Sequence, residues 1–257
     1  MKTLRSLLKL PLEASIDLWA MSVRFSFPKK YTWRWKMNML TEAYEKDTTD
    51  LFKTIVLPGM TIFDVGAHIG YFTRLFSRLV GEKGKVFAFE PDPDNFALLQ
   101  KNTAHLKNVT PIQAAVSDKS GTINFFEIED STGCHTTVPT NAPSKTLRVT
   151  AVTIDEFAAE ASPRLLKIDI EGGEPAALRG AEKLLTRQDS KIVLELNPEA
   201  LGRGGTTPKE LIAFMRIKGY RAYGILPGGR KSSPIDDIEG LRLYEEKSDF
   251  ANVLFEK

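Results

Sequence analysis

Residues 61–73 read TIFDVGAHIGYFT, and this stretch decides the fold because it combines a buried strand, a glycine turn and the start of a helix. The residues before the turn are mostly apolar and suit a central parallel strand. Gly66 permits a backbone conformation closed to other residues, and Gly70 lets the start of the helix pack closely. Apolar residues recur at helical spacing from Tyr71 to Leu79 and give that helix a face for the sheet. A glycine turn that opens a helix is a cradle for a nucleoside-type ligand.

The spacing of the glycines indicates which ligand fits. The dinucleotide fingerprint G-x-G-x-x-G has a middle glycine that lets the backbone touch a pyrophosphate. Here Ala67 and His68 stand near the middle of the turn, between Gly66 and Gly70, so a dinucleotide is disfavoured. A carboxylate at Asp64 suits a ligand with an ammonium group and repels a phosphate.

A second acidic residue supports a nucleoside ligand. Glu90 ends an apolar strand over residues 85–89, where a carboxylate can accept both hydroxyls of a ribose. S-adenosyl-L-methionine carries a ribose and an ammonium group but no phosphate, and it is therefore the expected cofactor. The cofactor-binding residues that we expect around this turn are Asp64, Gly66, Ala67, His68, Gly70 and Glu90.

Three motifs resemble those of the FkbM family of methyltransferases. They are DVGAHIGYFT at residues 64–73, FEP at 89–91 and LKIDIEGGE at 166–174, and the similarity extends over roughly residues 40–257. The resemblance implies an α/β class I methyltransferase fold, a doubly wound, Rossmann-like and mostly parallel sheet whose last strand is an antiparallel insertion. It also implies S-adenosylmethionine-dependent methylation, usually of an oxygen on a small molecule or sugar. Seven segments fit such a sheet, namely 62–65, 85–89, 109–114, 165–170, 191–196, 220–225 and 250–255.

Composition agrees with an ordinary globular enzyme. The chain has 257 residues, of which 42% are hydrophobic and 26% charged. Its formal net charge of +2 does not indicate a nucleic-acid partner. The single cysteine, Cys134, excludes an internal disulfide framework and fits a reducing cytoplasm. No apolar run is long enough to span a bilayer. We expect a cytoplasmic protein whose partner is a small-molecule or glycan substrate, with its oligomeric state left open.

Residues 1–40 are expected to form an N-terminal extension to a methyltransferase domain over residues 41–257. Polar residues and Pro11 interrupt the apolar residues of the first twenty positions, so a cleaved signal peptide is not expected. Residues 24–39 then interleave basic and aromatic side chains. One interpretation is a helical extension that packs on the domain with solvated lysines. The alternative is weak peripheral contact with an anionic membrane.

Residues 121–152 break the alternation of strands and helices. Residues 122–126 and 146–149 have strand character, which predicts an inserted hairpin beside the cofactor crevice. His135 lies in the loop of that hairpin and is a candidate catalytic base, although an exposed loop histidine without a role is the alternative. Asp118, in the polar turn after the third strand, is a candidate contact for the adenine amine.

Acidic residues mark the ends of the fourth and fifth strands. Asp169 follows the fourth strand and Glu195 interrupts the apolar fifth strand, at the sheet edge where ligands of open parallel sheets bind. With His135 they are the candidate catalytic residues, because a hydroxyl acceptor must lose a proton. Asp169 with Glu195 or Asn197 could also hold magnesium, as acids at these positions do in catechol-type methyltransferases, but we expect no metal.

Three other functions are weighed against O-methylation. A base-amino methyltransferase is expected to carry an Asp/Asn-Pro-Pro-aromatic motif after the fourth strand, and residues 169–172 depart from it. A nicotinamide oxidoreductase is disfavoured by the missing middle glycine. The third is a non-catalytic Rossmann-like module that binds a ligand or a membrane, which nothing in the sequence excludes.

Overall fold

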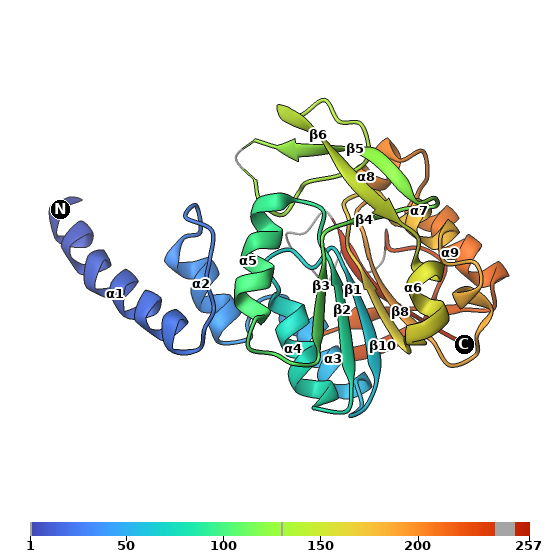
Figure 1. Ribbon diagram of the computed structural model, residues 1–257, viewed down its shortest axis with the longest axis horizontal. Coiled ribbons are helices and arrows are strands. Elements are labelled where there is room, and N and C mark those ends of the chain that lie inside the picture. Colours follow the sequence, from blue (N-terminus) through green and yellow to red (C-terminus); the bar gives the residue numbers. More distant parts are fainter. Residues whose placement is uncertain (1, 130, 240–249) are drawn as a thin grey trace.

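The structure, a computed structural model, describes residues 2–129, 131–239 and 250–257 (Figure 1). Its centre is an eight-stranded sheet in the order β10-β9-β11-β8-β7-β1-β2-β3. The parallel part consists of β1 (Thr61–Val65), β2 (Lys85–Phe89), β3 (Val109–Ile112), β7 (Leu165–Ile168) and β8 (Lys191–Leu196). The antiparallel strand β11 (Ala251–Glu256) inserts between β8 and β9 (Arg221–Leu226), and β10 (Arg230–Ile235) forms a hairpin with β9. The expected doubly wound sheet is confirmed, with β10 as an unexpected edge strand.

Helices cover both faces of this sheet (Figure 1). The helices of the domain are α3 (Lys46–Ile55), α4 (Tyr71–Val80), α5 (Pro93–Thr103), α6 (Ile154–Ala161), α7 (Glu174–Arg179), the short 3₁₀ helix η1 (Leu184–Thr186), α8 (Pro198–Arg203) and α9 (Pro208–Ile217). Successive residues of a strand face opposite sides. In β1, Phe63 packs into the core shared with α6, α7 and α9, whereas Ile62 packs into the core shared with α3 and α4. This burial on both sides explains why the central strands read as apolar runs.

Local sequence explains where several helices start and stop. The side chain of Asp92 accepts a hydrogen bond from the Asn95 amide (2.8 Å), and Pro93 occupies the first position of α5, where its missing N–H costs no hydrogen bond. Helix α7 ends before Gly180, and a separate 3₁₀ turn follows. A side chain at Gly180 would meet the Ser117 carbonyl oxygen at 2.1 Å, so the chain passes close to its neighbour there.

The inserted hairpin is confirmed. Strands β5 (Gly121–Ile128) and β6 (Ser144–Val152) pair antiparallel along their length, and β4 (Ala115–Val116) pairs with β6. These strands form a separate three-stranded sheet above the carboxyl edge of the main sheet (Figure 1). The loop between β5 and β6 returns to β5 through a bridge between Phe126 and Thr136. It therefore lies next to the edge where a ligand is expected.

The N-terminal segment contains α1 (Lys2–Ser22) and α2 (Trp33–Leu40), and α1 projects from the domain (Figure 1). The segment after α1 is fixed to the domain, since the guanidinium of Arg74 donates to the carbonyls of Val23 and Arg24. The Asn102 side chain also accepts a hydrogen bond from the Ser26 amide and donates one to the Ser26 carbonyl. Among the residues described, no helix is long and apolar enough to cross a membrane. The domain boundary at residue 40 stays a prediction.

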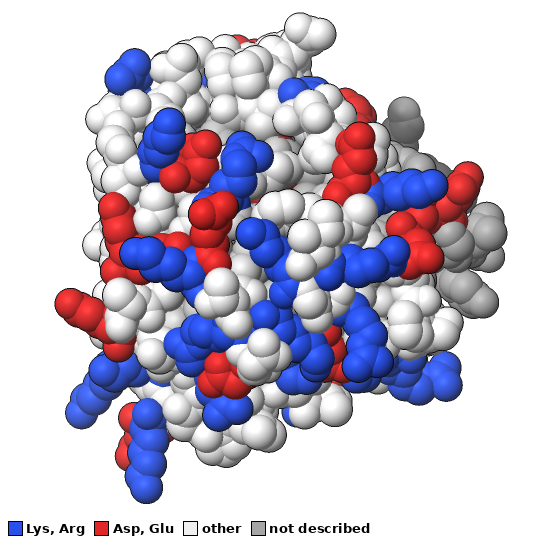
Figure 2. Space-filling model, turned by 90° about the vertical axis from the view of Figure 1, so that its right-hand side faces the viewer, with Lys and Arg blue, Asp and Glu red and all other residues white. Residues whose placement is uncertain are grey.

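Charged side chains are unevenly spread over the surface. Lys and Arg side chains gather in a band on the face that Figure 2 shows, with Asp and Glu side chains among them. Around the C-terminal strand, Glu256 pairs with both Lys191 and Lys231, and Asp189 pairs with Arg187. Positive charge is therefore partly neutralised, and the expectation of no nucleic-acid partner stays a prediction.

Candidate active site

A cavity lies at the carboxyl edge of the parallel strands. Its walls come from the turn after β1, the end of β2, the end of β7, the segment before α3 and the β5–β6 loop. The space between these walls is about 860 Å³, part of it open to solvent. Ligands of open parallel sheets bind at this edge, where the strand order reverses between β1 and β7.

The glycine turn forms the floor of the cavity. Gly66 has a φ of +80°, and a Cβ there would lie 1.8 Å from the carbonyl oxygen of Asp169. The amides of Gly66 and Ala67 both donate to the Phe89 carbonyl, at 3.0 and 2.9 Å. Glycine is therefore required at position 66, because the turn runs against the backbone after β7.

Two residues expected in the cofactor site around the glycine turn, Asp64 and Gly70, do not line the cavity. Asp64 is fully buried, and its Oδ2 accepts a hydrogen bond from the Thr73 hydroxyl (2.5 Å) on α4. Its Oδ1 is buried without a hydrogen-bond partner among the residues described. Gly70 caps α4 with a φ of +92° and packs against Leu99. Both residues support the turn on the side away from the cavity, whereas Gly66, Ala67 and His68 line the cavity.

Glu90 lines the cavity at the end of β2, as expected. Its two carboxylate oxygens accept hydrogen bonds from the amides of His68 (2.8 Å) and Asp92 (3.0 Å). Burial raises the pKa of Glu90 to about 8. Because each oxygen keeps a further lone pair, the carboxyl group can still accept two hydroxyl donors.

Asp118 lies away from the cavity. Its carboxylate is partly exposed and forms an ion pair with Arg179 at 3.7 Å. The residues just before it, Ala114 to Val116, do line the cavity. The polar turn after β4 is therefore close to the site, but the Asp118 side chain is not part of the wall.

His135 lines the cavity from the β5–β6 loop and is not an exposed loop residue, because its side chain is only 8% exposed. Its Nδ1 accepts a hydrogen bond from the Ile128 amide (3.0 Å). Its Nε2 lies 4.0 Å from Asp92 Oδ2. The ring is thus held at Nδ1, while Nε2 faces the Asp92 carboxylate.

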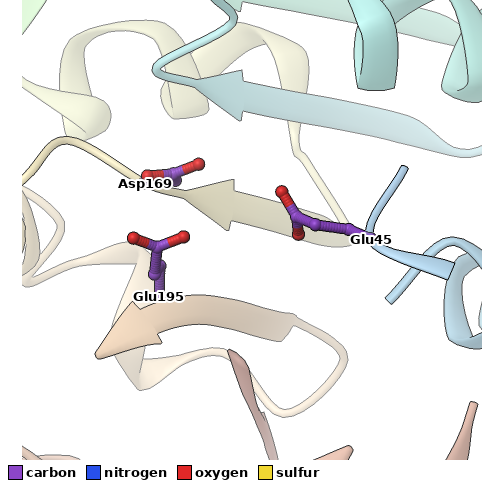
Figure 3. A group of neighbouring side chains, drawn as sticks. All are labelled: Glu45, Asp169 and Glu195. Atoms are coloured by element: carbon purple, nitrogen blue, oxygen red, sulfur yellow. The ribbon is translucent and has the colours of Figure 1, made fainter. Parts of the chain in front are cut away.

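Three carboxyl groups converge beside the cavity. Asp169, Glu195 and Glu45 point toward one another from β7, β8 and the segment before α3 (Figure 3). One oxygen of each lies within 4.8 Å of the others. Glu195 is 9% exposed, and burial and the nearby Asp169 raise its pKa well above the usual value. Glu45 accepts a hydrogen bond from the Asn252 side chain (3.0 Å), and burial raises its pKa to about 7.

Lys167 supplies positive charge to this acidic group. It is 3% exposed on β7, and its ammonium nitrogen lies 2.9 Å from Asp169 Oδ2. Burial alone would lower the pKa of Lys167, but the carboxyl groups of Asp169, Asp64 and Glu45 together raise it above the usual value. Lys167 therefore remains charged, and it also packs over the Phe72 ring at 5.0 Å.

The alternative magnesium ligand Asn197 has another role. Its side-chain oxygen accepts hydrogen bonds from the amides of Glu199 (3.0 Å) and Ala200 (3.2 Å) and so caps α8. Glu174 is also used structurally, since it accepts from the amides of Ile170 and Gly172 and closes the turn after β7. Asp169 and Glu195 lie close to each other beside the cavity, and Glu171 also lines it.

The sequence comparison decides the family. The model of the methyltransferase FkbM domain matches residues 64–222, more than half of the chain. The chain belongs to the FkbM methyltransferase family. The matched residues include the glycine turn, Glu90, His135, Asp169 and Glu195, whereas Glu45 and Asn252 lie outside them.

Curated relatives within and around the FkbM family are distant. The hexuronic acid methyltransferase AglP of Haloferax volcanii is 27% identical over 155 residues, which cover 60% of each protein. The 31-O-demethyl-FK506 methyltransferase FkbM of Streptomyces tacrolimicus is 29% identical, over 63% of this chain and 73% of the relative. The 2-O-methyltransferase NoeI of Sinorhizobium fredii is 28% identical, over 51% of this chain and 60% of the relative.

A solved structure supports the fold of the FkbM-family domain. The methyltransferase FkbM of Methylobacillus flagellatus superposes with a TM-score of 0.50 at 14% identity, and the match covers 96% of this chain but 58% of that one. The alignments with AglP and with this structure thus span less than two thirds of the other protein.

Glu45 and Lys167 are the site residues that sequence reasoning misses. Lys167 sits inside the apolar run of β7, and a buried lysine in a parallel strand indicates an internal acid, so a signal was present. Glu45 gives no such signal, because it lies in a polar stretch and reaches the site only through the fold of the segment before α3.

Proposed function

We propose that this protein transfers a methyl group from S-adenosylmethionine to a hydroxyl oxygen of a small-molecule or sugar-containing acceptor. The observation that carries the proposal is the cavity itself. Its wall contains the glycine turn, the buried carboxyl group of Glu90 after β2 and the Lys167–Asp169 ion pair at the end of β7. The names of AglP, FkbM and NoeI, which specify a hexuronic acid, a demethylated FK506 and a 2-O position, support an oxygen acceptor.

The residues of the cavity wall fit the cofactor. Gly66 lets the turn pack against the backbone after β7, where a Cβ would lie 1.8 Å from the Asp169 carbonyl oxygen, and so holds the turn at the floor of the cavity. Glu90 would accept the two ribose hydroxyls with its remaining lone pairs, and the apolar wall at Ala115 and Val116 suits the adenine ring. Asp64 would act on the ammonium end only indirectly, through the shape and charge of the turn, because it does not line the cavity.

The chemistry requires alignment and removal of a proton. When bound, the cofactor supplies an electrophilic methyl group on a sulfonium, so the protein must mainly orient the acceptor and exclude water. Asp169, held by Lys167, would orient an acceptor hydroxyl. Glu195 and Glu45, whose pKa values burial raises, would donate hydrogen bonds to other hydroxyls of a sugar when protonated and accept them when charged.

The cofactor assignment is tested by calorimetric titration with S-adenosylmethionine and S-adenosylhomocysteine. The native protein should bind both, and Glu90→Ala should lose at least tenfold in affinity. Glu160→Ala, which removes an exposed carboxylate on α6, serves as the matched control. Absence of binding to a folded native protein would overturn the proposal.

Transfer is tested with a methyl-labelled donor and a panel of hydroxylated acceptors that includes free hexuronic acids. Label in an acid-stable, base-stable ether identifies O-methylation. Donor binding without transfer to any acceptor would favour the non-catalytic alternative.

We also propose that the N-terminal segment contacts an anionic membrane surface from the cytoplasmic side. The apolar side chains of Leu18 and Met21 on α1 are 66% and 73% exposed, and basic residues such as Arg24 follow them. Apolar contact and attraction to anionic lipids together suit an interfacial helix. Co-sedimentation with phosphatidylserine vesicles, reduced in Leu18→Ser/Met21→Ser, would support this contact, and equal binding to neutral vesicles would contradict the electrostatic part.

A further inference from the structure

His68 occupies the middle of the glycine turn in a conformation that residues other than glycine rarely adopt. Its φ is +51°, and its amide donates to Glu90 Oε2 at 2.8 Å. A dinucleotide fingerprint would carry glycine near this point of the turn. The chain instead retains a large side chain at a strained position, and such strain is typical of functional sites.

The imidazole of His68 lines the cavity with one nitrogen unused. Its Nε2 is buried and has no hydrogen-bond partner among the residues described. The Thr132 backbone lies near the ring and opposes the lowering of the His68 pKa that burial causes. A neutral ring with its proton on Nδ1 leaves a lone pair on Nε2.

The other candidate bases are already engaged. The Nδ1 lone pair of His135 accepts the Ile128 amide, so the proton of its neutral ring sits on Nε2. Asp169 is paired with the Lys167 ammonium at 2.9 Å. Burial and the nearby Asp169 raise the pKa of Glu195 well above the usual value, which disfavours its basic form. His68 Nε2, by contrast, has no hydrogen-bond partner among the residues described.

We propose that His68 Nε2 is the general base that receives the proton of the acceptor hydroxyl. This inference rests on the proposed methyl transfer. The hydroxyl O–H bond breaks and its proton moves to Nε2, while an oxygen lone pair forms the new bond to the methyl carbon. The bond from that carbon to the sulfonium sulfur breaks, and its electron pair stays on sulfur. The imidazolium then releases its proton to solvent.

The surroundings of His68 keep the ring neutral at physiological pH. Burial lowers its pKa to about 4, an effect that Asp169 opposes and that His135 and Lys167 reinforce. The centroid of the Tyr31 ring lies 6.2 Å from that of His68. A charge that develops on the ring during transfer would be stabilised by the Asp169 carboxylate.

The state of the imidazole can be measured without a known acceptor. The chain has three histidines, so long-range ¹⁵N–¹H spectra of histidine-labelled protein resolve each ring, and His68→Asn assigns the signal. We expect His68 as the Nδ1–H tautomer, with an Nε2 signal that saturating S-adenosylhomocysteine leaves unchanged. A protonated Nε2 would overturn the proposal. A large shift with this ligand would also overturn it, because the lone pair would then serve the cofactor.

Substitution tests the role during transfer. His68→Asn tolerates a positive φ, so it should fold and bind S-adenosylhomocysteine normally while kcat falls by roughly 10²–10⁴-fold. His68→Gly should regain rate with added imidazole. His105→Asn, at an exposed position, is the control. Normal kcat in His68→Asn would refute the base, whereas loss of ligand binding by the native protein would instead refute the proposed function.

Discussion

The ammonium nitrogen of Lys167 lies 2.9 Å from Asp169 Oδ2, and both residues belong to the strand end that closes the cavity. They are two positions apart, so the same face of the chain after β7 presents a fixed pair of opposite charges. This pair links the buried interior, where Lys167 also faces Asp64, to the open side of the site.

Loss of the Lys167 charge should destabilise the protein. Lys167→Met leaves Asp169 and Asp64 without their cation, and breaking a buried pair on one side costs about 3–5 kcal/mol. Urea unfolding at neutral pH measures the change. Lys191→Met removes a partly exposed partner of Glu256 and should cost no more than about 1 kcal/mol. Equal losses in the two variants would show that Lys167 is not a buried charge centre.

Gly66 should not tolerate alanine. A Cβ would lie 1.8 Å from the Asp169 carbonyl oxygen at a φ of +80°, so we expect a loss of about 3 kcal/mol in stability and of S-adenosylhomocysteine binding. At Gly133, which also lines the cavity, a Cβ meets nothing within 4 Å. Gly133→Ala should therefore fold normally. Thermal unfolding measures the stability of both variants, and calorimetric titration measures their affinity for S-adenosylhomocysteine. Equal stability and affinity in the two variants would contradict the prediction.

The fold was readable from the sequence because buried parallel strands carry a strong local signal. The segments around Ile62, Val86 and Leu194 are apolar and are bounded by glycine, proline or polar turns. The edge strand β10 was missed, since residues 230–235 are polar and contain Pro234, which suits an edge position. Its pairing depends on the turn after β9 and not on a pattern of its own.

The site was readable only where motif and strand end coincide. Glu90 and Asp169 follow strands and do line the cavity, and Glu195 joins Asp169 beside it. We expect Asp64 in the cavity wall, but successive side chains of a strand face opposite sides, and the Asp64 side chain faces α4, where Thr73 donates a hydrogen bond to it. Glu45 reaches the site over more than a hundred residues of sequence separation, which local patterns cannot encode.

Cofactor binding should release a proton from Glu90. Burial raises its pKa to about 8, so the group is mostly protonated at pH 7 in the free protein. Ribose hydroxyls that donate to the carboxylate favour its charged form and lower the pKa, so a proton leaves. The heat of S-adenosylhomocysteine binding at pH 7 should therefore differ between phosphate and Tris, according to their ionisation enthalpies. The difference should vanish in Glu90→Gln, and equal heats for the native protein would contradict the linkage.

Stability should fall as the pH rises from about 4.5 to 8. Burial, with Asp169 and Glu174 nearby, raises the pKa of Glu171 to about 8, and burial raises that of Glu174 to about 7. The native state then binds more protons than the unfolded state in this window, and the free energy of unfolding decreases with pH. We expect a higher Tm at pH 6 than at pH 8, with a smaller difference in Glu171→Gln. A higher Tm at pH 8 would reverse the sign and contradict the prediction.

Divalent metal should be dispensable, because Lys167 already supplies the positive charge beside Asp169. A nearby ammonium repels a second cation, and magnesium binds through few protein ligands while keeping most of its waters. We expect S-adenosylhomocysteine affinity in 10 mM magnesium and in EDTA to agree within about twofold, and the Tm to change little. Binding with a Kd of 0.1 mM would instead stabilise the protein by about 2.7 kcal/mol at that concentration. That stabilisation would appear as a clear increase in Tm. If the increase were lost in Glu195→Gln but kept in Glu160→Gln, the converging carboxyl groups of Figure 3 would be assigned to a metal.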